Sequence, residues 1–320
     1  MKLKIIIYSG LVLLIAAIAF MVKDLYFDKS ESDRNPYNYD LKKLREVNPE
    51  LIGYKESQTI KSSVSEICAI AIDSEDKMYV AGKDSVEIFD ATEKSIKQFR
   101  TDGQANCMAV NKQNNIFLGI DNHIDIYTFD GKKTDSWKIE GTKTILTSIA
   151  VSDSFVFVAD AGNKLVYRFD TKGKLLGKIG VKNLAKGDSG FIIPSPFFDI
   201  AIGRDNELWI VNPGKHSLNA YSFDGHFISS WERSAMEVDG FCGCCNPSHI
   251  AMLSDGSFVT SEKSIERVKV HKQNGDFKCV VAPPTMFQEG THGLDLAVDS
   301  KDRIFVLDPV KNLVHIFVEK

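Results

Sequence analysis

The densest group of chemically reactive residues is Phe-Cys-Gly-Cys-Cys-Asn-Pro-Ser-His at positions 241–249. It holds Cys242, Cys244 and Cys245, and His249 follows four residues after the last of them. Thiolate and imidazole groups bind zinc and copper, so these four residues are candidate metal ligands and a transition metal such as zinc or copper is the candidate cofactor. The Cys-x-Cys-Cys spacing differs from the Cys-x2-Cys spacing of common zinc sites, which weakens this interpretation.

Two other interpretations of the cysteines stay open. In an exported chain they could form a disulfide that staples a long loop, or they could be a redox-active pair or free thiols. Cys279 lies in an apolar run and is expected to pack as a small hydrophobic residue. The sequence leaves the role of Cys68 undecided.

A repeat that begins near residue 66 must position this cysteine loop. Each of six units has three or four short β-rich runs separated by Asp, Asn and Gly, and an alanine recurs at positions 71, 109, 150, 201, 251 and 297. Spacings of 38 to 51 residues suit four-stranded blades. The sequence therefore predicts an all-β, six-bladed β-propeller. The sixth unit lacks a fourth strand, and the β-rich residues 51–60 are the candidate to close the ring.

The units resemble NHL repeats. Residues 156–166, Val-Phe-Val-Ala-Asp-Ala-Gly-Asn-Lys-Leu-Val, and residues 295–299, Asp-Leu-Ala-Val-Asp, are close to the usual NHL pattern. Residues 191–199, 240–249 and 259–270 are similar to a bacterial NHL-type subfamily with a Cys-Gly-Cys-Cys-Asn-Pro signature. The resemblance covers roughly residues 66–320. It implies the propeller fold and no particular activity, because propellers carry unrelated functions.

Potential ligands recur two positions before the repeated alanine. There the six units carry Ala69, Cys107, Ser148, Asp199, His249 and Asp295. If this register places them around the mouth of the central channel, Cys107, Asp199, His249 and Asp295 converge on one axial space. The alternative is structural, with Asp199 and Asp295 capping loop amides and His249 making an ordinary hydrogen bond.

The loops that enter the last three blades are long, about residues 180–197, 232–248 and 282–293. Elaborated loops on one rim of a scaffold commonly carry recognition, so we place the functional face on blades 4–6. His292 enters blade 6, where the alternative is an ordinary surface histidine. Glu262 and Lys263 follow the second strand of blade 5, where the alternative is a solvated ion pair. The predicted ligand-binding residues are Cys107, Asp199, Glu262, Lys263, His292 and Asp295.

The N-terminus predicts export. Residues 5–22 carry no charge and follow Lys2 and Lys4, so residues 1–22 are predicted to be a single-pass signal-anchor helix, with a polar stalk at 23–50 and the propeller at 51–320. The alternative is a cleaved signal peptide with a site at Ala17-Ile18-Ala19. Both place the propeller on the periplasmic or extracytoplasmic side of a bacterial cell membrane.

The composition of the chain and the absence of common catalytic motifs narrow the possible classes of function. The net charge of −4 and the lack of a Lys/Arg-rich run argue against nucleic-acid binding. The chain has no Gly-x-Ser-x-Gly, phosphate-binding glycine loop or His-Glu-x-x-His, which lowers the expectation of an enzyme. We therefore predict a membrane-anchored binding or scaffold module with an envelope or redox protein as partner. The alternative is a metal-dependent hydrolase or lyase in which Asp199, His249, His292 and Asp295 are ligands or the general base and the cysteines are structural.

Overall fold

A computed structural model describes residues 8, 14–23, 41–141, 143–182, 190–243 and 245–320. Residues 14–23 are helical. Within the described ranges, no helix has both the length and the apolar character needed to cross a membrane. The rest of the predicted anchor and most of the predicted stalk lie outside these ranges, so the anchor stays a prediction. The chain divides into a unit at Met1–Lys43 and a unit at Leu44–Lys320.

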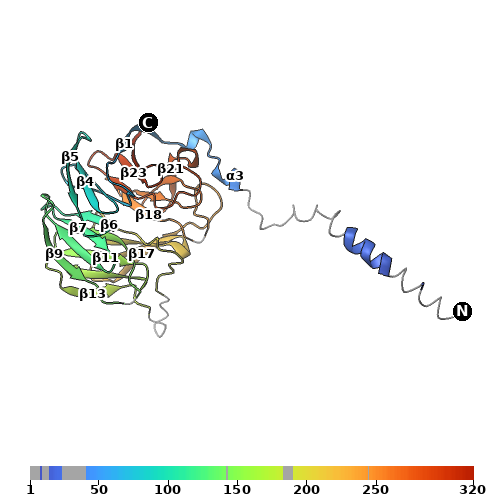
Figure 1. Cartoon of the computed structure of the whole chain (residues 1–320), viewed down its shortest axis with the longest axis horizontal. Coiled ribbons are helices and arrows are strands. Elements are labelled where there is room, and N and C mark those ends of the chain that lie inside the picture. The colour runs from blue at the N-terminus through green and yellow to red at the C-terminus, as the bar shows by residue number, and fades with distance from the viewer. Residues whose placement is uncertain (1–7, 9–13, 24–40, 142, 183–189, 244) are drawn as a thin grey trace. The chain divides into compact units, whose positions relative to one another are not determined.

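The second unit is a β-propeller, and its described residues form six four-stranded antiparallel sheets (Figure 1). Blades 1 to 3 consist of β2 (Ala69–Ile72), β3 (Met78–Ala81), β4 (Ser85–Phe89) and β5 (Ser95–Arg100); β6 (Ala105–Val110), β7 (Ile116–Ile120), β8 (His123–Tyr127) and β9 (Lys133–Lys138); and β10 (Leu146–Val151), β11 (Phe155–Asp160), β12 (Leu165–Asp170) and β13 (Leu175–Ile179).

Blades 4 to 6 contain the longer entering loops. They consist of β14 (Ile200–Ile202), β15 (Glu207–Asn212), β16 (Ser217–Ser222) and β17 (Phe227–Glu232); β18 (His249–Met252), β19 (Phe258–Ser261), β20 (Val268–His271) and β21 (Phe277–Ala282); and β22 (Leu296–Val298), β23 (Ile304–Asp308), β24 (Leu313–Glu319) and β1 (Tyr54–Lys61). The short helices are α3 (Leu41–Arg45), η1 (Pro49–Leu51), η3 (Pro213–Lys215) and η4 (Pro284–Met286).

Short polar side chains build the turns between first and second strands. Asp73 Oδ1 accepts hydrogen bonds from the backbone N–H groups of Glu75 and Lys77, at 2.8 and 2.9 Å. Asn111 and Asp299 bond the residues two and four positions later in the same way. Such Asx turns compete with helix and favour the tight connections between these strands.

Strand β1 closes the ring. It is the outer strand of blade 6, paired antiparallel with β24, so that Tyr54 lies opposite Glu319 and Lys61 opposite Leu313. The strand expected in residues 51–60 is therefore present, and it covers an edge that β24 would otherwise expose. Just before it, Gly53 N–H donates to Val280 O of blade 5 at 3.0 Å.

Packing between neighbouring blades fixes the inner strands. The six recurring alanines lie on the first strands, and Trp209 of β15 packs edge-on against Phe258 of β19 with 4.7 Å between ring centroids. Phe157 of β11 lies 5.1 Å from Phe223, which follows β16. Because large rings interlock between sheets, the residues at the start of each inner strand are held in fixed positions around the axis.

Candidate functional site

Side chains at the start of the inner strands join each blade to the next. Ser148 accepts a hydrogen bond from Ile200 N–H of blade 4 at 3.3 Å. In the same register, Asp199 Oδ2 accepts from Ile250 N–H of blade 5 at 2.7 Å. Asp295 Oδ2 accepts from Ile70 N–H of blade 1 at 2.9 Å. The two aspartates therefore cap backbone amides, as the structural alternative expects, and these bonds fix their orientation.

The same aspartates face His249. Its Nδ1 atom lies 3.7 Å from Asp199 Oδ2 and 3.4 Å from Asp295 Oδ1. Each of the three residues offers one ligand atom, and these atoms all lie within 4.8 Å of one another. The Nε2 atom of His249 is buried and has no hydrogen-bond partner among the described residues. The three side chains thus approach closely without making a direct hydrogen bond to one another.

The electrostatics of this cluster favour an added positive charge. Burial raises the pKa of Asp199, although His249 and three hydrogen-bond donors lower it. Burial, together with repulsion from Asp199, raises the pKa of Asp295 to about 6, against the lowering effect of His249. Two carboxylates that share a buried space resist double ionisation unless a cation or a proton lies between them.

An aromatic ring borders the cluster. The ring of Phe197 meets the imidazole of His249 edge-on at 6.0 Å and that of His292 at 6.5 Å. Lys263 Nζ lies 5.2 Å from the centroid of the same ring and donates a hydrogen bond to Ser195 Oγ at 3.3 Å. The predicted residues Asp199, His249, Lys263, His292 and Asp295 are therefore grouped around Phe197 and the axis.

The remaining predicted ligand-binding residues lie in the interior. Glu262 is 1% exposed, and its carboxylate accepts from Arg267 Nε at 2.8 Å and lies 3.1 Å from Lys269 Nζ. Burial lowers the pKa of Lys269 to about 8. Cys107 is buried beside Gly119, where an added Cβ would lie 2.4 Å from its Sγ, and burial raises its pKa.

The cysteine loop lies against this buried ion network. Cys242 and Cys245 are both buried, and Cys244 is outside the described residues. Burial beside Glu262 raises the pKa of the Cys242 thiol, with Arg267 and Lys269 opposing that rise. Among the described residues, the group of potential metal ligands that includes His249 contains the aspartates and no cysteine. The four-ligand site of Cys242, Cys244, Cys245 and His249 stays a prediction.

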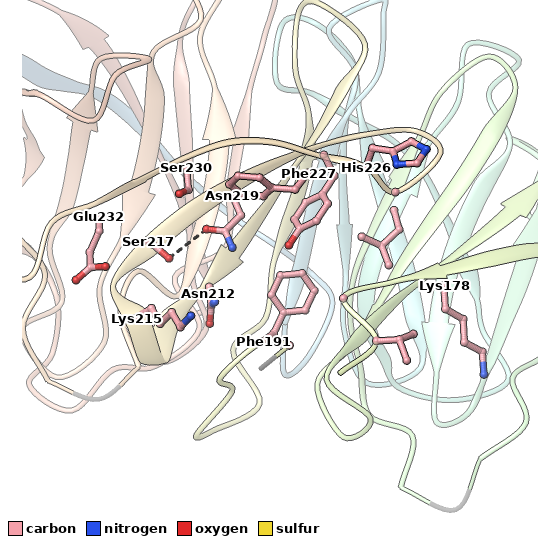
Figure 2. Close-up of a pocket in the computed structure, with 16 residues that line it drawn as sticks. Lys178, Phe191, Asn212, Lys215, Ser217, Asn219, His226, Phe227, Ser230 and Glu232 are labelled. Atoms are coloured by element: carbon pink, nitrogen blue, oxygen red, sulfur yellow. Dashed lines mark hydrogen bonds between the residues drawn. The ribbon is translucent and has the colours of Figure 1, made fainter. Parts of the chain in front are cut away.

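A groove of about 650 Å³ lies elsewhere, on the side of blades 3 and 4 (Figure 2). Figure 2 shows Lys178, Lys215, His226, Phe227 and Glu232 around it. None of its lining residues belongs to the axial cluster. We assign the chemistry to the axis, because the groove brings together no comparable group of acid, base and potential metal ligand among its described residues.

Three contributors to the axial site are absent from the residues selected by type and spacing. They are Ser195, Phe197 and Asn246. Asn246 is 2% exposed, and its side chain bonds the backbone of Lys263. All three lie within the stretches that carry the resemblance to the bacterial subfamily, which was the available signal.

Comparisons with known proteins support the fold. No known protein family matches the chain, so membership of the NHL family is not shown, and no curated protein is similar to it. Solved structures do match: a streptogramin B lyase has a TM-score of 0.61 at 11% identity, covering 83% of this chain and 98% of its own.

Two structures of virginiamycin B lyase from Staphylococcus aureus are also similar. A catalytically inactive variant with quinupristin has a TM-score of 0.58 at 10% identity, and a selenomethionine form has 0.55 at 12%. Each match covers 83% of this chain and 100% of the other. At such low identity these likenesses establish the β-propeller fold alone.

Proposed function

We propose that Asp199, His249 and Asp295 bind one divalent transition-metal ion and that the propeller is a metal-dependent hydrolase or lyase. The spacing of the three side chains carries this proposal. Distances of 3.4 and 3.7 Å from His249 Nδ1 to the carboxylates are longer than hydrogen bonds. All three potential ligand atoms lie within 4.8 Å of one another, so these three side chains would hold one ion between them.

The donor set suits catalysis better than a purely structural role. Imidazole with carboxylate oxygens is a common set for zinc and manganese, and three protein ligands leave a coordination position for water or substrate. Such an ion supplies Lewis acidity or activates a bound water. The hydrogen bonds that the backbone N–H groups of Ile250 and Ile70 donate orient the two carboxylates, as outer hydrogen bonds do at metal sites.

His292 is the candidate proton carrier beside this centre. Its exposed imidazole contacts Phe197, on the ring that also contacts His249. Imidazole is the side-chain group most often used to donate or accept a proton close to neutral pH. The lyases of similar fold support a lyase as the reaction class. At 10–12% identity their substrates are not carried over to this chain.

The test is ion binding by the propeller unit, residues 44–320, measured by calorimetry and by elemental analysis with zinc and manganese. We expect about one ion per chain and loss of binding in His249→Ala and in Asp295→Asn. His226→Ala, in the side groove, is the matched histidine control and should bind normally. Retention of the ion in a folded His249→Ala variant, or no binding by the parent chain, refutes the proposed centre.

A binding module is the second candidate. It is favoured by the hydrogen bonds that Asp199 and Asp295 accept from backbone N–H groups, which give both residues a structural role without any ion. In this case the face of blades 4–6, with the cysteine loop, holds an envelope or redox protein, and residues 1–22 anchor the chain in a bacterial membrane. Membrane fractionation of the full chain against residues 44–320, followed by cross-linking at the axial face, tests both parts.

A further inference from the structure

Lys263 is a half-buried cation without a described counter-ion. Its ammonium group donates to Ser195 Oγ at 3.3 Å and lies over the face of Phe197. Among the described residues, no carboxylate lies within ion-pair distance of it. The hydroxyl and the ring stabilise the ammonium but do not neutralise its charge.

The backbone of Lys263 is held unusually firmly for a loop between β19 and β20. One side chain, Asn246, accepts from Lys263 N–H at 2.9 Å and donates to Lys263 O at 3.2 Å. The same amide donates to Cys242 O at 2.7 Å. Because Asn246 is buried, its side chain fixes the position of the Lys263 backbone relative to Cys242.

Two buried carboxylates of the same loop are also anchored. Glu262 is bonded to Arg267 and Lys269, while Glu266 is fully buried, pairs with Arg45 and accepts from Gly290 N–H at 2.9 Å. A loop with this many buried hydrogen bonds holds the Lys263 side chain in a fixed position beside Ser195 and Phe197. Preorganisation of this kind is what a recognition group requires.

We propose that Lys263 is an anion-binding residue and that the ligand of the axial site carries a carboxylate or phosphate that meets its ammonium group beside Phe197. The ring is 5.2 Å from the ammonium and 6.0 Å from the His249 imidazole, so these groups lie no more than about 11 Å apart. One small molecule can span that distance. The inference rests on the proposed function in that the far end of this ligand meets the metal centre.

The experiment titrates the full chain with benzoate and with phenyl phosphate, which separate a carboxylate from a phosphate ligand. Uncharged benzamide is the probe without a negative charge. Binding is followed by ligand-observed NMR, with and without zinc. We expect Lys263→Met to weaken the preferred anion about tenfold or more, because it removes a charge-assisted hydrogen bond, while benzamide is unaffected. Lys263→Arg should recover part of the loss.

Lys112→Met, an exposed lysine paired with Asp153, is the matched control and should bind like the parent. Asn246→Ala should weaken anion binding without removing any charge. Equal binding by the parent and Lys263→Met, or equal affinity for benzoate, phenyl phosphate and benzamide, overturns the inference. Zinc stoichiometry in Lys263→Met should stay at the parent value, so a failure of the anion subsite is distinguishable from a failure of the metal centre.

Discussion

The buried ion network beneath the cysteine loop should dominate the stability of blade 5. Glu262 has no exposed side-chain surface and faces two cations, Arg267 and Lys269, that are themselves buried. The change Glu262→Gln keeps the shape and removes the negative charge. Breaking a buried pair by removing one partner costs about 3–5 kcal/mol, because the remaining charges are left uncompensated.

That cost converts into a thermal shift. The entropy of unfolding is about 2.1 cal/mol/K per residue, or about 0.6 kcal/mol/K for Leu44–Lys320. Dividing the lost stability by this entropy gives a fall in melting temperature of about 5–8 °C. The assay is calorimetry of residues 44–320 at neutral pH. Glu75→Gln is the matched control, since Glu75 is 64% exposed in its ion pair with Lys77 and should shift the transition by less than about 1 °C.

A double variant separates charge from packing. Adding Lys269→Met to Glu262→Gln removes one of the two unpaired cations, so the double variant should be more stable than the two separate losses predict. The reasoning is refuted if Glu262→Gln melts within about 2 °C of the parent, or if the two losses simply add.

Three further predictions follow from other parts of the fold. Deleting residues 51–62 should abolish the cooperative unfolding transition, because it exposes the edge of β24, whereas deleting residues 1–43 should leave the transition unchanged by circular dichroism. Gly162→Ala should destabilise by about 1–3 kcal/mol in urea, because its Cβ would lie 1.5 Å from Lys143 O, while Gly177→Ala, with no atom closer than 3.9 Å, should be neutral. Burial lowers the pKa of His315, but the Asp308 carboxylate 3.6 Å away and the hydrogen-bonded Glu56 carboxylate raise it overall. Since the folded pKa lies above the unfolded value, the stabilisation is complete below about pH 6.5 and is lost as the pH rises through the folded pKa. The urea midpoints of the parent and His315→Gln should therefore converge as the pH rises above about 6.5; a constant difference contradicts this account.

The repeat made most of the fold predictable. The recurrent alanine marks the crowded inner strand, and the Asx turns that follow it are local structures that a short sequence specifies. The closing strand was predictable because the sixth unit has three strands and residues 51–60 are the β-rich segment available nearby. The register argument also placed Asp199, His249 and Asp295 together, since residues at one position of each repeat must surround one axis.

The surroundings of His249 show that distance along the chain and distance in space differ. Cys245 is four residues from His249, yet among the described residues the potential ligands grouped with it are Asp199 and Asp295, each about fifty residues away on a neighbouring blade. Glu262 and Lys263 show the same limit: adjacent in sequence, one is buried with Arg267 and the other is half-buried over Phe197. Both lie in the loop after β19, where no strand alternation predicts which side chain is buried and only the surrounding packing decides it.

The closure of blade 6 has a consequence for synthesis. Strand β1 precedes the other described strands in the sequence and pairs with β24, which follows them, and Ser57 Oγ donates a hydrogen bond to Ile316 O across 259 positions of the chain. Until β24 emerges, β1 has no partner and the ring cannot form, whatever the progress of the blades between them. The Asp295 bond to blade 1 also waits for the sixth blade. The axial site is therefore a late product of translation: a chain interrupted before blade 6 lacks both the closed ring and the third side chain of the cluster.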